Sequence, residues 1–212
     1  MPYPSAPWNL QGHAFQTVNL LHIDRVQPFI PAELQIVSVV PGKTLGGMYV
    51  GCYGADSTLS YSELIVVSAI VQKAGQLGAW ISHIYVDNPD SVDGGRNIWG
   101  LPKQLAQFRW GLEKKPQVQV YQGDTLLCTL GNAWKFPGWQ QSLKLPVFSM
   151  LHSKLMTFEG QATFNFYLAG IDLQVPSQSP FAELGVEHPL LGFYLEPLHL
   201  VAGAPSTVLG AR

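Results

Sequence analysis

One stretch of the chain, GGRNIWGLPKQLAQF at residues 94–108, combines residue types that suit covalent chemistry. Its only lysine, Lys103, follows a Leu-Pro pair in a chain in which just 12% of residues are charged. A neutral lysine amine can attack a carbonyl carbon and form a Schiff base. An ordinary lysine has a pKa near 10.4, so less than roughly 0.1% of it is neutral at pH 7. A working lysine therefore needs an apolar pocket or a neighbouring cation.

The residues around Lys103 can supply both conditions. Apolar side chains such as Ile98 and Phe108 surround it in the sequence, and Arg96 and Arg109 are candidate cationic neighbours. The local sequence also fits a lysine at a strand edge that faces water, which is the commoner situation for this residue type. The segment by itself leaves both interpretations open.

Other kinds of site have weaker support in the sequence. The histidines do not pair at metal-ligand spacing, and no Walker loop, dinucleotide fingerprint or Gly-x-Ser-x-Gly elbow occurs, so we predict no metal and no cofactor. A net charge of -2 without a basic stripe argues against nucleic acid as a partner. Cys52 and Cys128 are isolated in apolar runs, and we interpret them as buried free thiols, with a disulfide left open. Because we find neither a targeting signal nor a membrane span, we expect a cytoplasmic protein.

The elements that must position Lys103 are mostly β-strands. The chain has 212 residues, 21 glycines and 16 prolines, which indicates one domain, 1–212, with many short turns. We predict a mostly β fold, an antiparallel barrel or cone that is incompletely closed, with few short helices. Helices are expected at 24–31, with Asp24 as N-cap, and at 90–100, although Gly94-Gly95 weakens the second. Strands are expected at 34–40, 44–53, 60–71, 79–88, 105–113, 117–121, 125–130, 143–149, 155–168 and 190–201.

Four segments resemble the acetoacetate decarboxylase family in the same order along the chain. GRNIWGLPKQL resembles the segment of that family in which Gly-Arg-Glu is followed by Pro-Lys-Lys-Leu. The other three are FIPAELQI (29–36), YSEL (61–64) and IYVDN (84–88). The resemblance covers roughly residues 20 to 110 and implies the family's β-rich fold.

The resemblance implies roles for individual residues. Lys103 falls on the Schiff-base lysine, Glu63 on a pocket glutamate and Arg96 on the arginine of the Gly-Arg pair. The family's second lysine is Gln104 here, and a further pocket acid is Met48. These two replacements make the expected pocket more apolar, so we expect a carbonyl substrate larger and less charged than acetoacetate. We predict catalysis by Lys103 and Glu63, and substrate contacts from Arg96, Met48, Gln104, Trp99 and Leu101.

A second resemblance leads to an alternative function. Residues 43–71 and the segment GLPKQLAQF are similar to the plant neoxanthin-deficiency group of this superfamily, which is linked to carotenoid formation. The first hypothesis is a Schiff-base lyase of the decarboxylase, aldolase or dehydratase type. The alternative is a non-catalytic barrel that binds an apolar ligand such as an isoprenoid or carotenoid. The low charge and 47% hydrophobic content also predict a homo-oligomer, dimeric or larger.

Overall fold

The computed structural model describes residues 3–111 and 116–208, and these residues are mostly β, as predicted. They form one twelve-stranded sheet with two short α-helices. The strands are β1 (Trp8–His22), β2 (Gln35–Ile36), β3 (Lys43–Tyr53), β4 (Tyr61–Lys73), β5 (Gln76–Val86), β6 (Lys103–Leu105), β7 (Gln107–Gly111), β8 (Gln117–Gln122), β9 (Thr125–Leu151), β10 (Lys154–Gln174), β11 (Leu191–Ala202) and β12 (Ser206–Thr207). The helices are α1 (Ile23–Val26), α2 (Pro89–Trp99) and the 3-10 turns η1 (Gln27–Phe29) and η2 (Ala182–Leu184).

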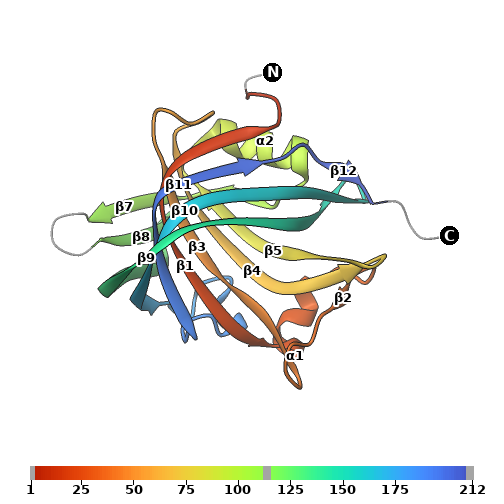
Figure 1. The fold of residues 1–212 in the computed structure, drawn as a ribbon. Coiled ribbons are helices and arrows are strands. Elements are labelled where there is room, and N and C mark those ends of the chain that lie inside the picture. The colour runs from red at the N-terminus through yellow and green to blue at the C-terminus, as the bar shows by residue number, and fades with distance from the viewer. Residues whose placement is uncertain (1–2, 112–115, 209–212) are drawn as a thin grey trace.

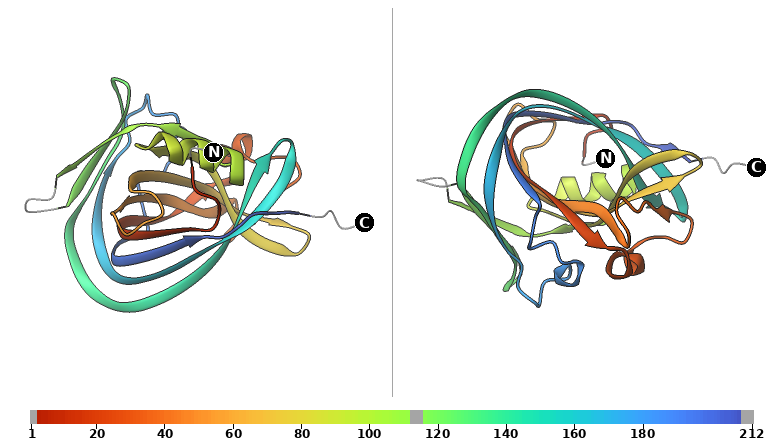
Figure 2. Two further views of the ribbon diagram at one scale, coloured as in Figure 1. Left: turned by 90° about the horizontal axis from the view of Figure 1, so that it is seen from above. Right: turned by 60° about the horizontal axis from the view of Figure 1, so that its bottom comes forward.

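The sheet curves around until its two sides meet. Its order is β12-β10-β11-β1-β3-β4-β5-β9-β8-β7, and β9 pairs with β10 as well, so the path from β10 to β9 returns to its start. Figure 2 shows this ring of strands from its two ends. Most pairings are antiparallel, but β5 and β9 meet in parallel over only two residue pairs, Ala79 with Val147 and Trp80 with Phe148. The ring is therefore closed, which corrects the predicted incomplete closure, and its shortest pairing is between β5 and β9.

Helix α2 lies across one end of the ring, while α1 lies at the opposite end (Figure 1). The Asn88 side chain caps α2 by accepting hydrogen bonds from the backbone N–H groups of Asp90 and Ser91, and Pro89 occupies the first turn. Gly100 ends the helix in the left-handed conformation at φ 68°, with its N–H bonded to the carbonyl of Arg96. These local signals set the helix immediately before the strand that carries Lys103.

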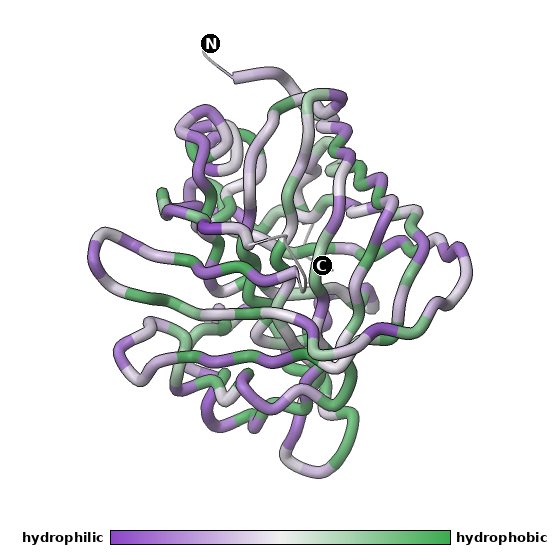
Figure 3. Tube along the Cα trace, turned by 90° about the vertical axis from the view of Figure 1, so that its left-hand side faces the viewer, coloured by the Kyte–Doolittle hydropathy of each residue, from purple (hydrophilic) through white to green (hydrophobic). Residues whose placement is uncertain are grey.

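Two apolar clusters fill the molecule, one on each side of the curved wall. Hydrophilic and hydrophobic residues alternate along many strands in Figure 3, as the two-residue period of a strand requires. One cluster contains Trp8, Ile84 and Trp99 and lies towards the interior of the ring. The other contains Phe15 and Met48 and packs under β8 and η2. Each strand of the wall thus presents one face to each cluster.

Four local predictions differ from the structure. The strand expected at 34–40 is limited to Gln35–Ile36. Residues 112–113 of the strand expected at 105–113 lie outside the described residues. Helix α1 begins at Ile23 with His22 at its N-cap, so Asp24 lies inside its first turn and does not cap it. The strand Trp8–His22 was not predicted, because Gly12 and polar residues interrupt its alternation. Strand β9 runs unbroken from Thr125 to Leu151 through residues read as a break. Within the residues that the structure describes, no helix is long and apolar enough to cross a membrane.

Candidate functional site

The interior of the ring holds a cavity of about 690 Å³. Its walls come from β1, β3, β4, β5, β9, β10 and β11, and its lining is overwhelmingly apolar. Leu143 and Leu145 of β9 and Phe164 and Phe166 of β10 are among these apolar residues. The charged side chains that line it in the described part of the chain are Glu63 and Lys103. This lining suits a largely apolar ligand, and the Lys103–Glu63 pair is the charged part of the wall among the described residues.

Lys103 is buried, with only 3% of its surface exposed. Its Nζ lies 2.7 Å from Oε1 of Glu63 and donates a hydrogen bond to Oγ of Ser91 at 3.0 Å. The same nitrogen lies 5.0 Å from the ring centre of Tyr61 and 5.6 Å from that of Trp8. An ammonium held in this way is paired and hydrogen-bonded, which offsets the cost of removing it from water.

The carboxylate of Glu63 links the lysine to two tyrosines. Its Oε2 accepts a hydrogen bond from the Tyr53 hydroxyl at 3.2 Å, and the Tyr53 and Tyr49 hydroxyls lie 2.9 Å apart. Burial raises the pKa of Tyr49 and of Tyr53, so both hydroxyls keep their protons at neutral pH. The site thus holds an ion pair that is continued by a chain of neutral hydroxyl groups.

Backbone features next to Lys103 hold it in place. Arg96 Nε donates a hydrogen bond to the Lys103 carbonyl at 2.7 Å, although the Arg96 side chain is otherwise exposed. A Cβ atom on Gly95 would lie 2.4 Å from Cδ of Lys103, so the absence of a side chain there makes room for the lysine. A Cβ atom on Gly100 would likewise clash with the carbonyl oxygen of Met150, and the positive φ of this residue suits glycine. Gly94, the other glycine that weakened the helix prediction, also has a packing role, because a Cβ atom there would lie 2.5 Å from the Trp8 ring.

The predicted site residues fall into two groups. Lys103, Glu63, Trp99 and Leu101 all line the cavity. Arg96 contacts the backbone of Lys103 and does not line the cavity, so the predicted substrate contact is replaced by a positioning contact.

Met48 and Gln104 are corrections to the predicted substrate contacts. Met48 is fully buried in the cluster beyond the wall, while its neighbour Tyr49 faces the cavity. Gln104 accepts a hydrogen bond from Gln122 of β8 at 2.9 Å and does not line the cavity. Each is next to a cavity-facing residue on its strand, since Met48 precedes Tyr49 and Gln104 follows Lys103. Because side chains alternate along a strand, Met48 and Gln104 point to the opposite side.

Several site residues were missed in the sequence. Tyr61 and Glu63 are two apart on β4, and Tyr49 and Tyr53 are four apart on β3, so the strand period would have placed each pair on one face. Ser91 reaches Lys103 from α2, a contact across twelve residues for which the sequence gives no signal. The strand period could therefore have identified the tyrosines, whereas no sequence pattern indicated Ser91.

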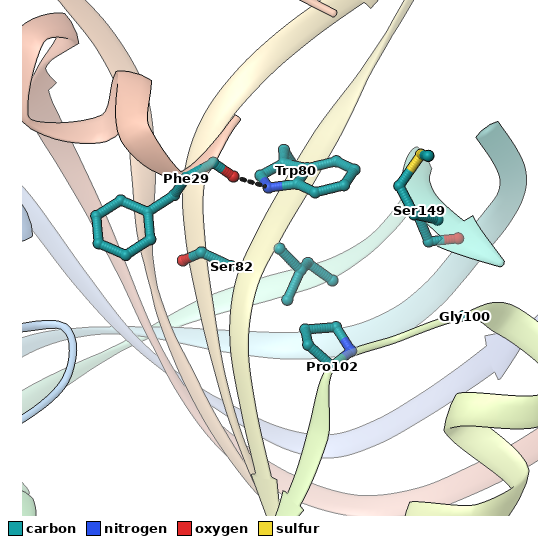
Figure 4. A pocket seen from close by; sticks show the side chains of 8 residues that line it. Phe29, Trp80, Ser82, Gly100, Pro102 and Ser149 are labelled. Carbon is teal, nitrogen blue, oxygen red and sulfur yellow. Dashed lines mark hydrogen bonds between the residues drawn. The ribbon is translucent and has the colours of Figure 1, made fainter. Parts of the chain in front are cut away.

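A smaller hollow of about 280 Å³ adjoins the turn before Lys103. Gly100 and Pro102 of that turn line it, and Figure 4 shows Trp80 beside them, with its indole N–H donating to the Phe29 carbonyl. Ile81 lines both this hollow and the main cavity. Among the described residues, no cluster of three or more His, Cys, Asp or Glu side chains is arranged to hold a metal ion. Both cysteines are free, so the disulfide that the sequence left open is absent; Cys128 is buried as interpreted, but Cys52 is only partly buried.

Solved structures with the same architecture include enzymes. The crystal structure of acetoacetate decarboxylase from Legionella pneumophila superimposes with a TM-score of 0.80 at 18% identity, covering 99% of this chain and 90% of that one. The enduracididine biosynthesis enzyme MppR, complexed with pyruvate, gives a TM-score of 0.71 at 13% identity over 96% of this chain and 91% of that one. At such identities, these matches establish the fold.

Sequence relatives come from plants. Protein NEOXANTHIN-DEFICIENT 1 of Solanum lycopersicum is 28% identical over 129 residues, which are 61% of this chain and 43% of that protein. The protein of the same name from Oryza sativa subsp. japonica is 31% identical over 117 residues, 53% of this chain and 38% of its own. The chain thus spans about two-fifths of the length of these curated relatives. The family described as acetoacetate decarboxylase (ADC) matches residues 1–164, and the chain belongs to that family.

Proposed function

We propose that the protein is a Schiff-base lyase, of the decarboxylase, aldolase or dehydratase type, that acts on an apolar carbonyl substrate larger than acetoacetate. The observation that carries this proposal is the position of Lys103, whose buried Nζ pairs with Glu63 at the wall of an apolar cavity of about 690 Å³. Enzymes with the same fold, including one named for complexes with pyruvate, support the proposal by analogy.

Glu63 has the proton-transfer role in this proposal. In the resting pair, Lys103 is an ammonium and Glu63 a carboxylate, 2.7 Å apart. Transfer of one proton across this contact leaves a neutral amine, which can attack the substrate carbonyl. The iminium that follows is a cation in the same place, so the carboxylate can stabilise it. The iminium then accepts the electron pair released when a neighbouring carbon–carbon bond breaks.

The size and lining of the cavity support a large apolar substrate. Acetoacetate is small and carries a carboxylate, for which a cationic partner is expected. In the described residues that line the cavity, the one cation is Lys103, and Glu63 already neutralises it. The apolar walls instead favour a hydrocarbon chain or ring attached to the reacting carbonyl.

Reductive trapping tests the proposal. The protein is incubated with acetoacetate, pyruvate or the branched enal citral at pH 6 to 8, reduced with borohydride, and digested for peptide mass spectrometry. We expect a stoichiometric adduct on Lys103 with citral, and none at that peptide in Lys103→Met. Lys144→Gln, at an exposed lysine, is the matched control and should label Lys103 normally. Labelling of Lys103 no faster than that of exposed lysines would refute a Schiff-base role.

A non-catalytic function in binding an apolar isoprenoid or carotenoid is the second candidate. Two observations favour it. Lys103 and Glu63 neutralise each other in an otherwise apolar cavity, and the sequence relatives are named for neoxanthin. The discriminating measurement is the binding of a fluorescent polyene fatty acid to the protein and to Lys103→Met. Binding that survives this substitution, without any borohydride adduct on the original protein, would favour the binding function.

We also propose self-association and a cytoplasmic location for the protein. Strand β9 exposes Trp134, Phe136 and Trp139, with 48%, 64% and 68% of their surface accessible, and exposed aromatic side chains of this kind favour contact with another subunit. Light scattering after size-exclusion chromatography tests the assembly. A monomer at micromolar concentration would rule it out.

A further inference from the structure

The ion pair at Lys103 is joined to the cavity by a second route, through tyrosine hydroxyls. Glu63 Oε2 accepts from Tyr53 at 3.2 Å, and the Tyr53 hydroxyl lies 2.9 Å from that of Tyr49. Tyr53 is buried and does not line the cavity, whereas Tyr49 does. A proton that reaches Glu63 from Lys103 therefore has a hydrogen-bonded path to a hydroxyl group on the ligand side.

A glycine makes this path geometrically feasible. Tyr49 and Tyr53 are four residues apart on β3, so their side chains point to the same face of the strand. Gly51 lies between them, and a Cβ atom there would be 2.7 Å from the Tyr49 hydroxyl oxygen. Because Gly51 has no side chain, the Tyr49 ring can lie along the strand and bring its hydroxyl to Tyr53.

We propose that Tyr49 is the catalytic acid that protonates the departing hydroxyl when the Schiff base forms on Lys103. This role rests on the proposed function. The amine first attacks the carbonyl carbon, and transfer of a proton from nitrogen to oxygen gives a neutral carbinolamine. At that stage Glu63 holds the proton that it took from the Lys103 ammonium.

The dehydration step returns this proton through the tyrosines. Tyr49 donates its proton to the carbinolamine hydroxyl, Tyr53 donates to Tyr49, and Glu63 donates to Tyr53. The carbon–oxygen bond breaks, water leaves, and the nitrogen lone pair forms the carbon–nitrogen double bond of the iminium. Overall, an ammonium and a carbonyl become an iminium and one water, and Glu63 ends as a carboxylate, so no outside acid is needed.

Tyr61 is the competing donor, because it also lines the cavity and its ring lies 5.0 Å from Lys103 Nζ. The hydrogen bonds of the described residues join Tyr49 through Tyr53 to the Glu63 carboxylate that stores the proton, and none of them joins Tyr61 to that carboxylate. This difference favours Tyr49.

The test is the rate at which Lys103 is trapped with citral in four phenylalanine variants. Each variant is mixed with citral, quenched with borohydride at increasing times, and the Lys103 peptide is quantified. We expect Tyr49→Phe and Tyr53→Phe to slow adduct formation by about 10²-fold, the lower range for a general acid. The final adduct yield should not change, because a catalyst alters rate and not equilibrium. Tyr61→Phe should slow trapping less than Tyr49→Phe does. Tyr85→Phe, whose side chain lies in the cluster beyond the wall and does not line the cavity, should trap at nearly the original rate.

The outcomes separate this inference from the proposed function. Trapping of Tyr49→Phe at the original rate would overturn the role of Tyr49, and slowing by Tyr61→Phe alone would transfer that role to Tyr61. If the unsubstituted protein gives no Lys103 adduct, the Schiff-base function itself fails, and the role of Tyr49 fails with it. Unfolding curves check that each variant is folded. Tyr53→Phe breaks the same chain, so it provides an independent test if Tyr49→Phe does not fold.

Discussion

Replacing Glu63 by glutamine should show how much the free energy of unfolding depends on the buried ion pair. The substitution keeps the shape of the side chain but removes the charge that lies 2.7 Å from Lys103 Nζ. Both side chains are almost fully buried, at 4% and 5% exposure. The ammonium would then have Ser91 and two aromatic rings as its neighbours, without a counter-charge.

The distance sets the size of the expected effect. Two unit charges 2.7 Å apart attract by about 6 kcal/mol at an effective dielectric constant of about 20. Desolvation of each ion costs several kcal/mol, so the pair as a whole contributes far less than the attraction alone. Removing one partner leaves the other uncompensated, which typically costs about 3–5 kcal/mol. We expect the lower end of this range for Glu63→Gln, because the amide can still hydrogen-bond.

Urea unfolding at pH 7, followed by tryptophan fluorescence, measures this cost. The set comprises Glu63→Gln, Lys103→Met and the double variant, with Glu159→Gln as control for the exposed Lys144–Glu159 contact. We expect the control to change the free energy of unfolding by at most about 1 kcal/mol. The double variant should lose clearly less than the sum of the single variants. Single-variant costs that add within about 0.5 kcal/mol would refute the idea of an uncompensated buried charge.

Three further predictions follow from other parts of the structure. Gly95→Ala should slow trapping of Lys103, because the new Cβ would lie 2.4 Å from the lysine Cδ, whereas Gly111→Ala, with open space around it, should not. Burial raises the pKa of Cys128 to about 12, so Ellman's reagent at pH 8 should react with it only after unfolding, and reaction in the native protein would contradict its burial. Burial lowers the pKa of His13 and of His83, so at mildly acidic pH the unfolded chain binds protons that the folded chain does not. The melting temperature should therefore fall as pH drops below about 6.5. A flatter dependence of the melting temperature on pH in His83→Gln would confirm the cause.

Local signals made much of the fold predictable. Apolar runs marked β3 to β5, and the helix expected at 90–100 matches α2 to within one residue at each end. The β-branched run at 34–40, in contrast, forms a strand only at Gln35–Ile36. The prediction failed for β9, which continues through a proline. Pro137 lies within β9, where it pairs with Tyr167 of β10, and the strand continues because the ladder with β10 supports it from one side. Such support comes from residues distant in the sequence, so a local pattern does not reveal it.

The candidate site was predictable to a similar extent. Lys103 was singled out by its sequence context together with the family resemblance, and Glu63 by the resemblance. Trp99 and Leu101 were chosen for their nearness to Lys103, and all four line the cavity. Met48 and Gln104 were wrong because matched positions in a family motif say nothing about which face of a strand a residue occupies. Ser91 and the tyrosine chain depend on how α2 and β3 pack around the lysine, which only the assembled ring determines.

The origin of the cavity walls has a consequence for how this protein could diversify. The polar groups Lys103, Glu63, Tyr49 and Ser91 lie on β3, β4, α2 and β6, in the first half of the chain. Much of the apolar lining comes from β9, β10 and β11, in the second half. Substitutions on those three strands can reshape the space available to a ligand without touching the ion pair. The same reactive groups could therefore act on substrates of very different shape, because the residues that set reactivity and the residues that set substrate selectivity lie on different strands.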